Sequence, residues 1–211
     1  MTSTAPDTPR KRGRPRGSSI DRAILKGAAR AFAAQGYAAC RIEDILQAAG
    51  VSRTHFYRRF SNKDQLYRRL VARHLDYAQR RLRAVPQGFE ADLPPQERLR
   101  RIIETDVEVA FEAGPFLTVL LRDLGRSEAH ADLWREKDAF FLDLLTDMID
   151  AAGYPRPEPL LLAAIISGIE HILVGLTETE IDPEIRRQSA VALIGQLLSA
   201  LRAPGAGDGS Q

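Results

Sequence analysis

Residues 42–63, IEDILQAAGVSRTHFYRRFSNK, limit the possible folds of this chain more than any other stretch, because they predict two short helices joined by a tight turn. Gly50 can adopt the left-handed backbone conformation that ends the first helix, and Ser52 can cap the second. Phe56 and Phe60, spaced i, i+4, give the second helix an apolar face that packs inward. We therefore expect a helix-turn-helix.

The opposite face of the second helix carries side chains that can read DNA. At about 100° per residue, Thr54 and Arg58 point away from the phenylalanines, and His55 and Tyr57 lie on the flanks. These groups are donors, acceptors and a cation, which is the chemistry that recognises base edges in the major groove. The pattern predicts a DNA-binding helix.

A set of residues with defined spacing surrounds this motif. The set is Gly36-Tyr37, Asp44-Ile45, Ala49-Gly50-Val51-Ser52, Phe56-Tyr57, Phe60 and Lys63. Their order resembles the N-terminal domain of TetR-family transcriptional regulators over about residues 19–75. The resemblance implies that Tyr57 and Lys63 touch phosphates and that the N-terminal part of the 53–60 helix reads base edges.

Two positions depart from the family pattern. Arg41 stands where the family usually has a Ser or Thr cap, and His55 stands where a small hydroxyl residue is usual. The residues of this domain expected to contact DNA are Arg41, Ser52, Arg53, Thr54, His55, Tyr57, Arg58 and Lys63.

The first 18 residues contain Ser, Thr, Pro, Gly and cations with almost no apolar side chains, so this arm should be disordered when free in solution. Its Arg12, Gly13, Arg14, Pro15 and Arg16 resemble an AT-hook core, in which arginines enter the narrow minor groove of A·T-rich DNA. The alternative is a basic tail held near phosphates by charge alone. We favour minor-groove entry, and in either case removal of the arm should weaken binding.

The net charge of +2 conceals two oppositely charged parts. Residues 1–83 hold 19 Lys and Arg against 6 Asp and Glu, which gives +13, and the remaining 11 against 22 give −11 for residues 84–211. A basic N-terminal part attracts a polyanion, whereas the acidic remainder should point away from it.

The rest of the chain shows helical periodicity and no alternating β pattern, so we expect an all-α fold with an N-terminal helix-turn-helix domain of three helices and a larger helical domain for ligand binding and dimerisation. Further helices are predicted over residues 96–113, 115–126, 130–152, 158–179 and 183–202. The expected divisions are a disordered basic arm (1–18), a DNA-binding domain with its connecting helix (19–83), an effector-binding and dimerisation domain (84–203) and a disordered tail (204–211).

The last two predicted helices have surfaces that allow close helix packing. Ala163, Ala164, Ser167, Gly168 and Gly175 are small, and a second set follows a 3-4-3 stripe. That stripe is Val191, Ile194, Leu198 and Leu201. These surfaces are either buried inside one subunit or form a four-helix bundle in a homodimer. We favour the homodimer, because two-fold pairing fits palindromic half-sites and the family resemblance implies it.

The middle helices would enclose a pocket for a small-molecule effector, since they combine apolar walls with few polar groups. The residues expected to contact the effector are Phe111, Arg122, Trp134, Phe141, Glu170 and His171. The aromatic residues can equally be plain core. Glu170 and His171 interrupt an apolar helix, so they face either the effector or the dimer interface.

The sequence does not support a disulfide-bonded protein, a metalloprotein, an enzyme or a membrane protein. Cys40 is the only cysteine, which excludes an internal disulfide, and the four histidines lack metal-ligand spacing. No catalytic or nucleotide-binding motif is present, so we expect no enzyme activity, no metal and no cofactor. The longest apolar run, about Pro159 to Ile169, is too short to span a bilayer, and we expect a cytoplasmic protein without a membrane segment.

The function favoured by these features is a ligand-responsive dimeric repressor that binds double-stranded DNA at a palindromic operator and leaves it when an unidentified small molecule binds. The release mechanism is implied by the family resemblance. An architectural or effector-independent DNA-binding protein is the main alternative, and an activator on the same scaffold is a third.

Overall fold

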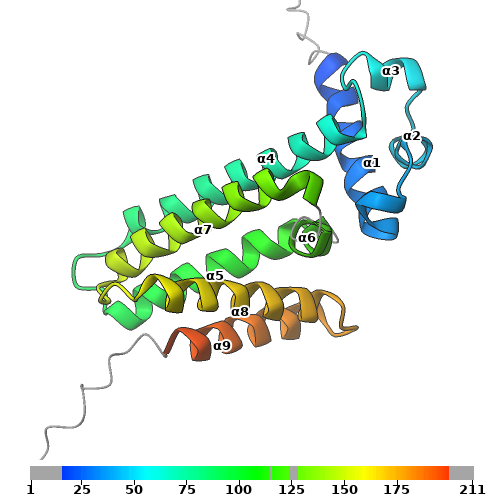
Figure 1. Ribbon diagram of the computed structural model, residues 1–211. Coiled ribbons are helices and arrows are strands. Elements are labelled where there is room, and N and C mark those ends of the chain that lie inside the picture. The colour runs from blue at the N-terminus through cyan, green and yellow to red at the C-terminus, as the bar shows by residue number, and fades with distance from the viewer. Residues whose placement is uncertain (1–15, 115, 124–127, 200–211) are drawn as a thin grey trace, which may run out of the picture.

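The computed structural model describes residues 16–114, 116–123 and 128–199, which contain nine α-helices and no strand (Figure 1). The expected all-α fold is therefore confirmed. The helices are α1 (Arg16–Ala39), α2 (Ile42–Ala49), α3 (Arg53–Tyr57), α4 (Lys63–Ala84), α5 (Pro95–Glu112), α6 (Phe116–Thr118), α7 (Ala131–Ala152), α8 (Pro159–Thr177) and α9 (Pro183–Ser199). Short 3₁₀ turns follow α4 (Pro86–Gly88) and precede α7 (Glu128–His130). A π-helical turn (Val119–Asp123) extends α6.

Helices α1 to α3 and the first half of α4 share one apolar core. Ile24, Phe32, Ile45, Phe56 and Leu66 in this core are completely buried. Burial of each such side chain contributes roughly 1.5–3 kcal/mol of transfer free energy. The predicted inward face of α3 is thus confirmed, and it holds the helix against α1 and α2.

The turn between α2 and α3 has the predicted conformation. Gly50 adopts φ 64° and ψ 36°, and its N–H donates to the carbonyls of Leu46 and Gln47. The hydroxyl of Ser52 accepts from the N–H of His55 at 3.3 Å, which caps α3. A residue with a Cβ would be strained at this φ, so glycine allows the tight turn.

One predicted boundary differs in the structure. α3 ends at Tyr57, although the sequence suggested a helix to Phe60. α1 begins at Arg16, and the cap of α4 is Asn62, whose side chain accepts from the N–H of Gln65 at 2.8 Å.

The C-terminal helices form a second layer. α4 runs from the first core into this layer and lies alongside α7, while α8 and α9 pack together on the far side of α5 (Figure 1). Most predicted helices begin and end within a few residues of those observed. The exception is the helix predicted over 115–126, which consists of α6 and the π turn.

This irregular segment joins the two cores. Phe116 and Val119 are buried among residues of α1 and α4 in the first core, whereas Leu117 belongs to the second core. Leu120 is 1% exposed and packs with the first core. A π turn changes the direction of successive side chains, which lets one short segment serve both cores.

α8 is longer than the apolar run identified in the sequence. It continues past Glu170 and His171 for a total of 19 residues, and its most apolar window has a mean hydropathy of 2.0. By length and composition it could cross a membrane, and 17% of that window is buried in this chain. A helix that lies at an interface between two subunits has the same composition, so this property has two physical explanations.

Candidate DNA-binding surface and effector cavity

α3 presents a polar surface to solvent. Ser52, Thr54, His55 and Arg58 are exposed, and Tyr57 is 48% exposed, while Phe56 beneath them is fully buried. The outward orientation inferred from the sequence is therefore that of the structure. The hydroxyl of Ser52 lies 2.9 Å from Nδ1 of His55, which restrains the imidazole at the start of the helix.

The arginine side chains around α3 differ in whether they form ion pairs. Arg53 forms an exposed ion pair with Glu43 of α2, and Arg59 pairs with Asp21 of α1. For Arg58 the described part of the chain provides no side-chain partner. Exposed ion pairs contribute little stability, so the pair between Arg53 and Glu43 can open at a small cost in free energy.

Arg41 precedes α2 with an exposed side chain. Its backbone N–H donates to the carboxylate of Asp44 at 2.8 Å. This bond needs only the backbone of Arg41, which explains how the helix begins without a Ser or Thr cap and leaves the guanidinium outside.

Lys63 occupies an unexpected environment. Its ammonium donates to the carbonyls of Tyr37, Ala38 and Cys40 at 2.7, 3.4 and 2.8 Å and lies 4.4 Å from the centre of the Tyr37 ring. These bonds give Lys63 a structural role that the sequence did not suggest, and the phosphate contact expected of it stays a prediction. The side chain ties the start of α4 to the end of α1.

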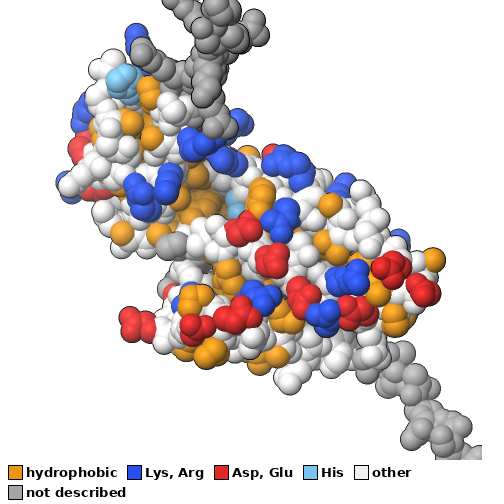
Figure 2. Space-filling view, turned by 180° about the vertical axis from the view of Figure 1, so that it is seen from behind, with side chains coloured by type: hydrophobic (Ala, Val, Ile, Leu, Met, Phe, Trp, Pro, Cys, Tyr) orange, Lys and Arg blue, Asp and Glu red, His pale blue; other side chains and the backbone are white. Residues whose placement is uncertain are grey.

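The basic arm lies mostly outside the described residues. Arg12, Gly13, Arg14 and Pro15 precede them, and Arg16 begins α1 with a side chain that is not described. Figure 2 shows Lys and Arg side chains over the N-terminal helices, whereas Asp and Glu are interspersed with them over the C-terminal layer. A groove between α1 and α4 adds Arg22, Arg69 and Arg73 to the basic surface, none of which the sequence had singled out.

A polar network joins the DNA-binding helices to α7. Nε2 of His130, which is 1% exposed, lies 2.7 Å from a carboxylate oxygen of Asp64, and Arg68 donates to both Asp64 and Asp132. Partial burial would raise the pKa of Asp64, but hydrogen bonds from His130 and Arg68 outweigh that effect and lower it. The start of α7 is thereby attached to the first turns of α4.

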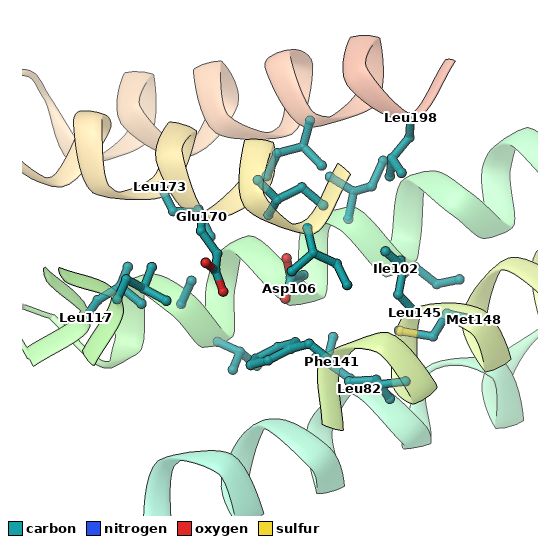
Figure 3. Close-up of a pocket in the computed structure, with 18 of the residues that line it drawn as sticks. Leu82, Ile102, Asp106, Leu117, Phe141, Leu145, Met148, Glu170, Leu173 and Leu198 are labelled. Carbon is teal, nitrogen blue, oxygen red and sulfur yellow. The ribbon is translucent and has the colours of Figure 1, made fainter. Parts of the chain in front are cut away.

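The C-terminal layer encloses a largely apolar cavity (Figure 3). Its walls come from α4, α5, α6, α7, α8 and α9, and most of the lining residues are Leu, Ile, Val, Phe or Met. Leu120 and Leu121 of the π turn also line it. A concave apolar space with few polar groups is the usual form of a small-molecule site.

The titratable residues on the cavity wall are His74, Asp106 and Glu170. Burial lowers the pKa of His74 to about 4, so this imidazole is neutral near pH 7. Burial, and secondly the charge of Glu170, raise the pKa of Asp106 to about 6. Burial also raises the pKa of Glu170, against the opposing effect of Lys137.

The predicted effector residues separate into groups. Phe141 and Glu170 line the cavity, whereas Phe111 and Trp134 pack beside the cores without lining it. His171 is exposed on the outer face of α8. The side chain of Arg122 lies outside the described residues.

His74 and Asp106 were missed by the sequence interpretation, although a signal for Asp106 exists. Asp106 interrupts the apolar stripe formed by Ile103, Val107 and Ala110, just as Glu170 interrupts α8. A titratable residue on an apolar helix face must find a partner, a cavity or a neutral state.

The stripe on the last helix faces inward. Ile194 and Leu198 are at most 2% exposed and line the cavity, and Val191 packs against the same core. For Ile194 and Leu198 this decides between the alternatives in favour of burial within one subunit. Leu201 lies outside the described residues.

The model of the family described as bacterial regulatory proteins, tetR family, matches residues 24–70, which contain α2, α3 and the contacts that orient them. The match therefore covers the N-terminal core and none of the cavity-forming helices after α4.

Known proteins with similar sequences are transcriptional regulators. The transcriptional regulator AcuR of Cereibacter sphaeroides is 33% identical over 107 residues, which are 47% of this chain and 48% of that protein. The transcriptional activator FasR of Mycolicibacterium smegmatis is 32% identical over 81 residues, 38% of this chain and 36% of that protein. The chain thus spans about half or less of these relatives.

Among solved structures, a tetR-family transcriptional regulator from Streptomyces coelicolor superimposes with a TM-score of 0.64 at 21% identity. The superposition covers 87% of this chain and 80% of that one, so the likeness of fold extends through the C-terminal layer.

Proposed function

Since this chain belongs to the TetR family of DNA-binding transcriptional regulators, we propose that it is a dimeric repressor that binds a palindromic operator and is released by a small molecule in its apolar cavity. The observation that carries the proposal is Leu120, which lines the cavity and also packs in the core of the DNA-binding helices. A ligand that displaces the side chain of Leu120 directly changes the packing of this residue against α1.

The DNA contacts follow from exposure. Thr54, His55 and Arg58 point outward from α3 and are assigned to base edges, whereas Arg41 and Tyr57 are assigned to phosphates. Ser52 and Arg53 lie at the start of the same helix. The basic arm of residues 12–16 is assigned to the adjacent minor groove.

The proposed dimer uses the outer face of α8 and α9. Leu160 is 83% exposed, Ile185 is 56% exposed, and the small residues Ala164 and Ser167 lie exposed between turns of α8. An exposed apolar face with small residues allows two helix pairs to approach closely across a two-fold axis. This also gives the apolar composition of α8 a use in a cytoplasmic protein.

Two routes connect the cavity to α3. One runs through the π turn and Leu120 to α1, and the other runs along α7 to His130, which is bonded to Asp64 at the start of α4. Differential affinity of the ligand for two arrangements of these contacts would change the spacing of the two recognition helices in the dimer.

The test is fluorescence anisotropy on the intergenic DNA beside its gene and on random duplex, across a range of salt concentrations. A repressor of this kind binds the former tightly at salt concentrations that abolish random binding. Equal and salt-sensitive binding to both would instead indicate an architectural protein. FasR, one of the similar proteins, is a transcriptional activator. A promoter–reporter assay therefore decides whether this protein represses or activates transcription.

A further inference from the structure

We propose that the ligand of the cavity is an apolar organic monocation, such as an amine, whose charged group pairs with Asp106. This inference rests on the proposed effector function and adds the chemical class of the ligand. Asp106 lies on α5 and lines a cavity whose other walls are almost entirely apolar (Figure 3).

The charged residues around the cavity differ in whether they have a partner of opposite charge. Lys137 of α7 is fully buried, forms ion pairs with Glu170 and with Asp138, and lies 3.8 Å from the centre of the Trp134 ring. The positive charge of Lys137 is therefore already matched by Glu170. For Asp106, by contrast, no hydrogen bond or ion pair occurs with the described residues, so its carboxyl group is the one left for a ligand.

The state of Asp106 also favours a cation. Its pKa of about 6 leaves the carboxyl ionised near neutral pH, inside a site where an unpaired charge is costly. His74 on α4 is neutral at that pH, and α6 and α9 contribute only apolar side chains. A bound ammonium group would pair with the carboxylate of Asp106, whereas a bound carboxylate or phosphate would place another negative charge beside it.

The remainder of the wall selects an apolar body. Phe141 and Met148 from α7, Ile102 from α5 and Leu173 from α8 face the same space as the Asp106 carboxyl. A hydrocarbon or aromatic skeleton attached to the amine replaces water against these surfaces and gains transfer free energy.

The experiment compares head groups on fixed skeletons. Octylamine, octanol and octanoate, and the corresponding phenylbutyl amine, alcohol and acid, are titrated by isothermal calorimetry into the full-length protein at pH 5 and pH 7. The same compounds are then added to the protein–operator complex in an anisotropy assay. Asp106→Asn removes the charge without changing the shape, and Asp143→Asn, an exposed aspartate of α7, is the matched control.

The expected result is that the amines bind about ten-fold or more tightly than the alcohols, and the acids least. The amines bind more weakly at pH 5, where Asp106 must first release a proton. Asp106→Asn loses the preference for amines but still binds the alcohols, which shows that its cavity is intact, and Asp143→Asn behaves like the parent.

Other results overturn the inference. Equal binding of the three head groups, tighter binding of the acids, unchanged amine binding by Asp106→Asn, or no binding of any compound would each contradict an amine ligand. Failure of the proposed function looks different: the amines bind with the expected dependence on Asp106, yet the operator complex does not dissociate.

Discussion

At the scale of single residues, Lys63 shows how a cation near a DNA-binding helix can have a structural role. Its ammonium bonds three carbonyls at the end of α1, so Lys63→Met leaves those carbonyls unpaired. We expect the free energy of unfolding to fall by about 1–3 kcal/mol in urea titrations. Lys26→Met, at an exposed site on α1, should leave it within about 0.5 kcal/mol. Weaker DNA binding without a loss of stability would contradict this structural role and favour the predicted phosphate contact of Lys63.

Asp106 lowers the stability of the empty protein at neutral pH. Its pKa rises from the usual 3.8 to about 6 on folding, so the folded state binds the proton more tightly and the free energy of unfolding decreases as pH rises between these values. At pH 7, Asp106→Asn should therefore unfold at a higher temperature than the parent. Its free energy of unfolding should be larger by roughly 1–3 kcal/mol. The difference should shrink towards pH 4, where both side chains are neutral.

Comparison of variant and parent is needed because His74 has the opposite effect. Its pKa falls to about 4 on folding, so its contribution to stability is lost as pH decreases from about 6.5. Subtracting the two unfolding curves cancels that contribution. An Asp106→Asn variant that is less stable than the parent at pH 7 would contradict the burial of an unpaired carboxylate.

At the scale of elements, the contact between α1 and α2 depends on Gly27. A Cβ at this position would lie 2.6 Å from the backbone of Ala49, so the two helices touch directly. Gly27→Ala should lower stability by about 1–3 kcal/mol in urea titrations and weaken operator binding in anisotropy assays, because α2 and α3 must move. Gly195→Ala in α9, where a Cβ meets no atom within 4 Å, should instead be neutral or stabilising. Equal effects would refute the steric argument.

Neighbouring residues of the π turn allow two steps to be tested separately: the binding of an effector and its effect on the DNA-binding helices. Leu121 lines the cavity, and Val119, which is 4% exposed, packs against the DNA-binding core. Leu121→Ala should weaken binding of an effector, whereas Val119→Ala should leave its affinity nearly unchanged and reduce the change in operator affinity that it causes. Ligand titrations with and without operator DNA measure both quantities. If Val119→Ala responds like the parent, the coupling does not run through this turn.

At the scale of the whole molecule, the exposed face of α8 carries the prediction about assembly. Ala164→Arg places a large charge on this face and should convert a dimer into monomers in light-scattering chromatography, with operator affinity reduced by about 100-fold or more because two half-sites are no longer bound together. Ala139→Arg, at an exposed position of α7, is the matched control. A dimeric Ala164→Arg protein would place the interface elsewhere.

Local patterns predicted the DNA-binding helices better than the cavity. Gly50, Ser52, Phe56 and Phe60 act over a few residues, and their backbone conformation, cap and burial are those expected from spacing alone. Asp106 was not identified, because a carboxylate that interrupts an apolar stripe has the same spacing whether it faces a partner side chain or a cavity.

The sequence by itself determined the all-α class, the helix-turn-helix and the charge division between the two parts, since each arises from short-range periodicity and composition. Only the tertiary structure decided that Lys63 caps α1, that Ile194 faces the cavity, and that Leu120 serves both cores. The physical reason is that these contacts join residues far apart in the chain, and their partners are set by how whole helices pack.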